Sequence, residues 1–158
     1  MKYTYYGEVL PTAEREQYNQ TIAARIEEGN IAAIEQEQVF NRFTGKGGLH
    51  GLRRNDYSSY YSYAEAKKEL EQGQFFTPPQ LCRQIIDALR PRPDFRIADL
   101  TCGMGNFFNY LPEESNIYGN ELDDTTCEVC RYLYPKATID NKDFIYCQAA
   151  QRFDLILG

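Results

Sequence analysis

The stretch Asp99-Leu-Thr-Cys-Gly-Met-Gly-Asn-Phe107 decides the fold, because it joins a predicted strand to a predicted helix through a glycine-rich turn. The strand spans residues 95–100 and the short helix spans residues 107–111. Asp99 therefore stands at the carboxyl end of a strand. Gly103 and Gly105 allow the turn a positive φ and let its backbone approach a ligand closely. This arrangement is typical of the first strand of a nucleotide-type binding sheet.

Upstream of this turn, the sequence predicts a helix. Thr77-Pro-Pro-Gln80 has the pattern of a capping box with proline in the first helical position, and the helix runs to about Arg90. Its apolar face is marked by Leu81, Ile85 and Leu89.

Downstream, helix and strand alternate. Strands are predicted over 116–121, 137–140 and 153–157, and Asp123 caps a helix that runs through Tyr134. The last strand is apolar throughout, which predicts burial on both faces. The pattern indicates an α/β fold with an open, mostly parallel sheet of about four strands.

Residues 1–72 have a helical, charged texture instead. Thr12 is predicted to cap a helix, Gly29-Asn30 to separate two apolar stripes, and residues 60–72 to form a further helix that Gly73 ends. The stripes consist of Tyr18, Ile22 and Ile26, then Ile31, Ile34 and Val39. We therefore divide the chain into an α-helical N-terminal segment, 1–72, and an α/β core, 73–158.

Composition excludes several classes of protein. The chain has 158 residues, 42% hydrophobic, with a net charge of −6. It has no apolar run of the roughly 18 residues that span a membrane, and no signal peptide. Five cysteines without framework spacing predict a reduced, cytoplasmic protein, and Cys127 and Cys130 lack the second pair that a zinc site needs. The acidic balance argues against a chain that is by itself a nucleic-acid-binding module.

One segment is basic. Residues 40–55 contain no acid, four basic residues, four glycines and the sole histidine, His50. Two interpretations remain open: a flexible loop that contacts a phosphate backbone, or a solvated loop that happens to be basic.

The acid and the glycines of the first turn limit which ligand it can take. A dinucleotide-binding loop has a third glycine where this chain has Phe108, and Asp99 would repel a pyrophosphate. A nicotinamide-dependent oxidoreductase is therefore disfavoured. An acid here suits a ligand with a positive end, such as the amino group and sulfonium of S-adenosylmethionine; a turn without a ligand is the alternative.

Two further acids follow the next two strands. Glu121 ends the second strand, where a carboxylate can accept hydrogen bonds from both ribose hydroxyls. Asp143 follows the third strand and could accept from an adenine amino group, while Phe144 and Leu122 cover the base. Three acids at successive strand ends lie on one edge of a parallel sheet.

These motifs together resemble the amino-group DNA methyltransferases, in the adenine-N6 branch that includes type I restriction-modification subunits. The resemblance covers roughly residues 72–158 and rests on Gly73-Gln-Phe-Phe-Thr-Pro-Pro79, Asp99–Phe107, Glu121, Asp143-Phe144 and Phe153-Asp-Leu-Ile-Leu-Gly158. The earlier run Phe43-Thr-Gly-Lys-Gly-Gly-Leu-His-Gly-Leu52 resembles the segment that precedes the methylase in large methylase–helicase proteins of mobile elements.

The resemblance implies a Rossmann-like methyltransferase sheet and S-adenosylmethionine as cofactor. Thr77 would bind the methionine carboxylate, Asp99 would lie by its amino group, and Glu121 would hold the ribose. The expected cofactor-binding residues are Phe76, Thr77, Pro78, Asp99, Thr101, Cys102, Gly103, Gly105, Glu121, Leu122, Asp143 and Phe144. DNA is the implied partner, through parts of the protein beyond this chain, with the basic loop Arg42–Arg54 as a candidate contact.

The chain departs from the family at its end. In the family the last strand continues into Asn-Pro-Pro-Tyr/Phe, which binds the target amino group and stacks on the flipped base, whereas this sequence stops at Gly158. We therefore expect the cofactor half of a methyltransferase, inactive by itself, with its fourth strand as an exposed edge. Open alternatives are a protein-glutamine or RNA methyltransferase, or a non-catalytic domain that binds cofactor or a partner chain.

Overall fold

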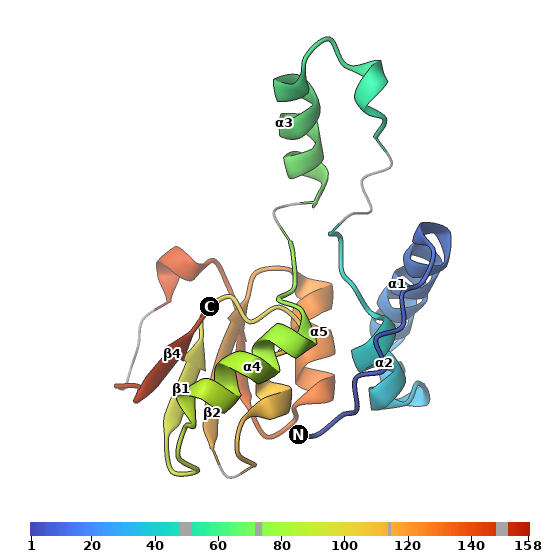
Figure 1. Ribbon diagram of the computed structural model, residues 1–158. Helices are drawn as coiled ribbons and strands as arrows, with labels where there is room; N and C mark the ends of the chain where they lie inside the picture. Colours follow the sequence, from blue (N-terminus) through green and yellow to red (C-terminus); the bar gives the residue numbers. More distant parts are fainter. Residues whose placement is uncertain (48–51, 72–73, 114, 148–151) are drawn as a thin grey trace.

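The computed structural model describes residues 1–47, 52–71, 74–113, 115–147 and 152–158 (Figure 1). Helices and strands follow one another in the order α1 (Thr12–Glu27), α2 (Gln36–Arg42), α3 (Tyr60–Glu71), α4 (Pro79–Leu89), β1 (Arg96–Asp99), β2 (Asn116–Glu121), α5 (Asp124–Leu133), β3 (Thr138–Asn141) and β4 (Leu155–Leu157). Short 3-10 helices lie at Ile31–Ala33, Arg54–Asp56, Phe108–Tyr110 and Phe144–Tyr146. The expected α/β order of elements is confirmed.

The strands form one parallel sheet in the order β3-β2-β1-β4. Asp99 at the end of β1 pairs in register with Gly119 on one side and Leu157 on the other. The chain order reverses at β1, because later strands are added on both sides of it. In open parallel sheets, ligands bind at the carboxyl ends of the strands beside such a reversal.

The N-terminal helices pack on the sheet through α5. In Figure 1, α5 lies between the strands and the pair α1 and α2, and it contacts β2, β3, α1 and α2. One hydrophobic cluster contains Ile22 and Val39 of the N-terminal helices together with Ile97 of β1 and Leu133 of α5. The division of the chain at residues 72 and 73 stays a prediction.

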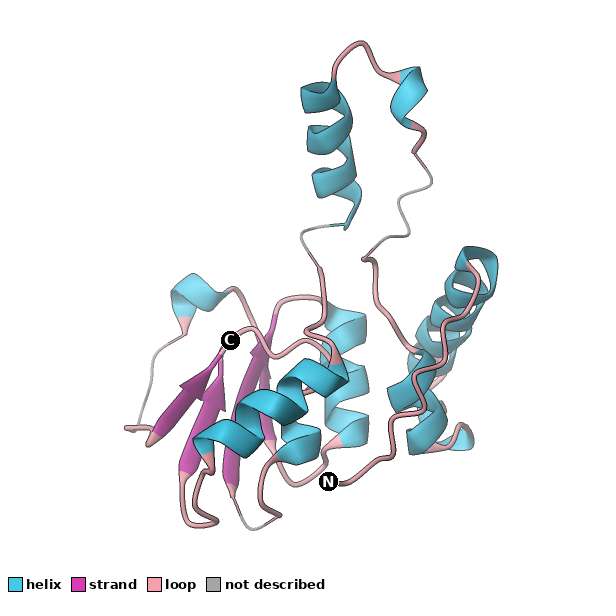
Figure 2. Cartoon of the chain, viewed as in Figure 1, coloured by secondary structure: helices cyan, strands magenta, loops and turns pink. Residues whose placement is uncertain are grey.

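The first residues of the chain are fastened to the core by a buried amide. Asn109 is 1% exposed, and its Oδ1 accepts hydrogen bonds from the backbone N–H of Lys2 at 3.0 Å and of Tyr3 at 2.6 Å. Its Nδ2 donates to the Tyr3 carbonyl at 2.9 Å. The hydroxyl of Tyr3 donates to the Leu133 carbonyl at the end of α5. By contrast, α3 stands away from the sheet (Figure 2).

Two predicted helix caps are wrong by one residue. Pro11 precedes the first helix in extended geometry, so Thr12 is the first helical residue rather than the cap. Pro78 likewise has φ −56° and ψ 136°, and α4 begins at Pro79. A residue before proline is pushed out of the helical region, so Pro78 cannot be helical ahead of Pro79, and Thr77 does not cap the helix. Asp123 does cap α5, because its side chain accepts from the N–H of Thr126.

Burial corrects two further expectations. The buried side chains of α4 are Cys82 and Ile86, whereas Leu81 and Leu89 of the predicted face are 45% and 49% exposed. β4 is an edge of the sheet, as expected, but it is not buried on both faces. Its side chains alternate, so Leu157 is buried while Ile156 is 62% exposed.

Candidate cofactor-binding site

A cavity of about 330 Å³ opens at the carboxyl ends of β1 and β2. Its walls come from the segment before α4, the turn after β1 and the start of the β2–α5 connection. The lining residues are Gln74, Phe75, Phe76, Thr77, Asp99, Thr101, Cys102, Gly103, Met104, Asn106, Phe107, Glu121, Leu122, Asp123 and Gly158. A volume of this size lies at the lower end of the range for small-molecule sites.

The structure brings eight of the twelve predicted residues together in these walls. They are Phe76, Thr77, Asp99, Thr101, Cys102, Gly103, Glu121 and Leu122. The other four, Pro78, Gly105, Asp143 and Phe144, are not among the lining residues. The roles assigned to these side chains stay predictions.

Asp99 is the deepest acid of the site. It is 2% exposed, and its Oδ1 accepts a hydrogen bond from the Thr101 N–H at 3.2 Å. Burial raises the pKa of Asp99 to about 6, because the carboxylate has lost its hydration; the Thr101 N–H opposes this shift and the charge of Glu121 adds to it. A cationic ligand group would stabilise the carboxylate in this place.

Glu121 lies opposite, at the end of β2. Its Oε1 accepts a hydrogen bond from the Asp123 N–H at 2.8 Å, which fixes the carboxylate relative to the β2–α5 connection. Burial raises the pKa of Glu121, and the neighbouring charge of Asp123 acts in the same direction, while the Asp123 N–H lowers it. The backbone N–H groups of Gly103 and Leu122 lower the pKa of Glu121 as well, so backbone donors hold the carboxylate in place at the cavity.

Gly103 explains why the turn after β1 needs glycine. Its φ is +54°, and a Cβ built on it would lie 2.8 Å from Cδ1 of Phe76. Gly105 also has a positive φ, of +84°, but a Cβ there would meet Tyr134 and Phe108. The first glycine therefore lets the turn approach the Phe76 segment at the cavity, and the second lets it approach the core. Because Gly105 approaches the core, it does not line the cavity.

Thr77 takes part through its backbone rather than as a helix cap. Its carbonyl accepts a hydrogen bond from Nδ2 of Asn106 at 2.9 Å, which ties the segment before α4 to the turn after β1. Among the described residues, the buried Oδ1 of Asn106 has no hydrogen-bond partner. Asn106 therefore joins two walls of the cavity through its Nδ2, while its Oδ1 is enclosed by the protein.

Asp143 and Phe144 lie outside the cavity. The Asp143 side chain accepts a hydrogen bond from the Ile145 N–H at 3.0 Å, where it caps the 3-10 helix Phe144–Tyr146. Phe144 is 53% exposed, and Leu122 at the cavity rim is 64% exposed. Of the expected adenine contacts, Leu122 therefore lies in the cavity wall, whereas Asp143 and Phe144 do not.

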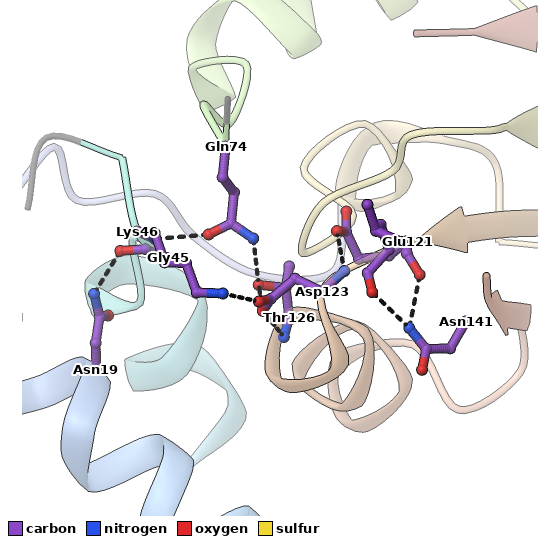
Figure 3. A network of polar contacts seen from close by, with 9 residues as sticks. Asn19, Gly45, Lys46, Gln74, Glu121, Asp123, Thr126 and Asn141 are labelled. Carbon is purple, nitrogen blue, oxygen red and sulfur yellow. Dashed lines mark hydrogen bonds and ion pairs between the residues drawn. The ribbon is translucent and has the colours of Figure 1, made fainter. Parts of the chain in front are cut away.

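Sequence reasoning missed seven of the fifteen lining residues, among them Gln74, Asn106 and Asp123, and it also missed Asn120. Gln74 and Asp123 line the cavity and belong to one polar network (Figure 3). Asn120 is 1% exposed, and its Nδ2 donates to the carbonyls of Leu100 and Lys142, so it holds the turns after β1 and β3 together. The position of Asn120, directly before Glu121 at the carboxyl end of β2, was the signal that could have identified it.

The remaining candidate residues lie elsewhere. Cys127 and Cys130 are fully buried in the core, and Cys130 Sγ lies 3.9 Å from Cys102 Sγ. Within the described ranges, no group of three metal-ligating side chains is found, and no helix is long and apolar enough to cross a bilayer.

Of the basic segment, Arg42 belongs to α2 and pairs with Glu8 at 3.1 Å. His50 lies outside the described residues.

This sheet order, together with a glycine turn and acids at the ends of β1 and β2, defines a Rossmann-like α/β fold. The chain belongs to the N-6 DNA methylase family, since the model of that family matches residues 58–146. The match begins within the segment that precedes α3, upstream of the predicted boundary at residue 73, and ends before β4.

Curated relatives belong to type I restriction enzymes. The chain is 32% identical over 81 residues to the methylase subunit of the enzyme EcoKI from Escherichia coli K12, which covers 49% of this chain and 15% of that protein. It is 29% identical over 96 residues to the StySPI methylase subunit of Salmonella potsdam, covering 58% of this chain and 18% of that protein. The chain thus spans less than a fifth of the length of these relatives.

Solved structures also match. One is the modification subunit of a putative type I restriction enzyme from Vibrio vulnificus, with a TM-score of 0.45 and 20% identity over 61% of this chain and 26% of that one. Another is a TehB-like methyltransferase from Corynebacterium glutamicum, with a TM-score of 0.43 and 26% identity over 61% and 52%.

Proposed function

We propose that this chain is the S-adenosylmethionine-binding part of a DNA methyltransferase that methylates adenine at N6. The observation that carries the proposal is the joint placement of Asp99 and Glu121 in the walls of one cavity beside the glycine turn. The membership of the N-6 DNA methylase family supports the nature of the reaction.

The residues of the cavity fit this cofactor chemically. S-adenosylmethionine has an ammonium and a sulfonium group, and Asp99 is a buried carboxylate whose pKa is raised by that burial. Glu121 would accept from the ribose hydroxyls and Thr77 would face the methionine carboxylate.

The adenine of the cofactor would extend toward the exposed rim. Leu122 would cover one face of the base, while Phe144 and Asp143 would reach the base and its amino group. When bound, the cofactor supplies the methyl group, and the residues of this chain orient it and shield it from water. The buried, free cysteines support a reducing cytoplasmic setting as part of the proposal.

Calorimetry tests the binding site. Glu121→Ala should weaken binding of S-adenosylhomocysteine by about 1.5–3 kcal/mol, the range for hydrogen bonds to a charged group. Glu128→Ala is the matched control, because Glu128 pairs with Arg131 on an exposed face of α5. Equal affinity of the wild type and Glu121→Ala would refute the assignment of the ribose site.

The acceptor requires a separate experiment. N6 transfer needs groups that accept hydrogen bonds from the target amino group, and the family places them in Asn-Pro-Pro-Tyr/Phe after the fourth strand. We therefore expect no methyl transfer to DNA from these 158 residues and N6-methyladenine when that motif and the residues after it are added. Mass spectrometry of nucleosides after incubation with labelled cofactor distinguishes N6-methyladenine from methylated protein or RNA. Transfer by the 158-residue chain would contradict the proposal.

A further inference from the structure

The basic segment contacts the cavity wall directly. The backbone N–H of Lys46 donates to Oε1 of Gln74 at 2.6 Å, and Nε2 of Gln74 donates to Oγ1 of Thr126 at 2.9 Å (Figure 3). A Cβ on Gly45, whose φ is +60°, would collide with the side chains of Gln74 and Phe76. The glycine therefore permits a close approach that places Lys46 beside the site.

The side chain of Lys46 ends on an acid of the cavity. Its Nζ lies 2.5 Å from Oδ2 of Asp123, which is 14% exposed. Asn19 of α1 holds the same loop, because it donates to the Gly45 carbonyl at 2.7 Å and accepts from the Thr44 N–H at 3.1 Å. Because Asp123 is mostly shielded from water, this pair differs from the fully exposed pairs that contribute little.

Asp123 connects Lys46 to the predicted ribose site. The other carboxylate oxygen, Oδ1, accepts from the N–H and the hydroxyl of Thr126 at 2.9 and 2.8 Å, and its own N–H donates to Glu121. Burial by itself raises the pKa of Asp123, but the hydrogen bonds from Lys46 and Thr126 outweigh it and keep the pKa below its usual value. Asp123 is therefore an anion next to Glu121, and the charge of Lys46 offsets its repulsion of the second carboxylate.

We propose that Lys46 is a positioning residue for the cofactor site: it holds Asp123 and, through it, the Glu121 carboxylate in the arrangement that binds the ribose. The inference rests on the proposed function. It gives Gly45 and Lys46, directly after α2, a role within the cofactor site. A lysine 77 residues before its partner thereby completes the site.

A double-mutant cycle tests this role with S-adenosylhomocysteine as the probe and calorimetry as the readout. Lys46→Met should weaken binding about tenfold, since a charge-assisted contact to the site is lost. Lys46→Arg should recover most of the affinity, because a cation again reaches Asp123. In a Glu121→Gln background, Lys46→Met should change the affinity less than about twofold, since residues that act on one another are non-additive.

Two controls keep the outcomes distinct. Arg92→Met removes an exposed ion pair with Asp94, at the other end of β1, and should bind as the wild type does. Thermal melting confirms that each variant folds, and Lys46→Gln replaces Lys46→Met in the cycle if the latter does not. No binding by the wild type would refute the proposed function itself. If the wild type binds, either of two results would overturn the role of Lys46 and leave the proposed function standing. One is equal affinity of the wild type and Lys46→Met. The other is a loss from Lys46→Met that is as large in the Glu121→Gln background as in the wild type.

Discussion

Replacing Asp99 with asparagine should stabilise the ligand-free chain while it weakens cofactor binding. Asp99 is 2% exposed and its pKa is raised from 3.8 to about 6. Asparagine has nearly the same shape, carries no charge, and can still accept from the Thr101 N–H. The substitution therefore removes the burial of a charge and keeps the local hydrogen bond.

The size and the pH dependence of this stabilisation follow from the raised pKa of Asp99. At low pH both the folded and the unfolded chain hold the proton, so aspartic acid and asparagine should be equivalent. As the pH rises from 3.8 to about 6, the unfolded chain loses the proton first, and the wild type loses stability through this window. At pH 7 the difference amounts to about 3 kcal/mol at most, from a shift of about two units at 1.36 kcal/mol each.

Urea denaturation of the wild type and Asp99→Asn at pH 3.5 and pH 7 measures this difference, and calorimetry at pH 7 measures binding. We expect equal stability at the lower pH, a more stable variant at pH 7, and about 1.5–3 kcal/mol less binding energy for S-adenosylmethionine. Asp94→Asn, in an exposed pair with Arg92, is the control. A variant less stable than the wild type at pH 7 would show that Asp99 carries no burial penalty and would refute the reasoning.

Three further substitutions test separate parts of the structure. Thr77→Ala should change the free energy of unfolding by less than about 0.5 kcal/mol in urea denaturation, because its hydroxyl has no hydrogen bond in the described structure, yet it should lower cofactor affinity in calorimetry. Gly103→Ala should destabilise by about 1–2 kcal/mol through its positive φ alone, and an unchanged melting temperature would contradict the geometry of the turn. Asn109→Ala should lower the free energy of unfolding by at least about 2 kcal/mol in urea denaturation, since it leaves backbone groups of Lys2 and Tyr3 without partners. A loss below about 0.5 kcal/mol, the effect of a surface substitution, would show that the N-terminus is not held there.

Local sequence patterns predicted the helices and strands whose ends are set by neighbouring residues. The predicted bounds of β2, 116–121, agree with the structure, and the strand ends at Glu121. Asp123 caps α5 because its carboxylate accepts from an N–H three residues on. The start of α4 was missed because two prolines in a row leave two candidate first residues, and only the rule on residues before proline separates them.

The site was predictable where strand ends define it and not where distant segments meet. Asp99 and Glu121 follow from the topology, because parallel strands place their carboxyl ends on one edge. The contact of Lys46 with Gln74 and Asp123 joins residues 28 and 77 positions apart, and no local spacing encodes it. The position of Phe144 outside the cavity was missed because a strand-end rule places the turn and not the direction of the side chain after it.

Calorimetric titration of the 158-residue chain with S-adenosylmethionine tests the central claim most directly. We predict saturable binding at one site in the micromolar range, weakened by Glu121→Ala and unchanged by Glu128→Ala. No heat of binding at high micromolar concentration, from a chain that melts cooperatively, would contradict the claim and favour a domain with a structural role.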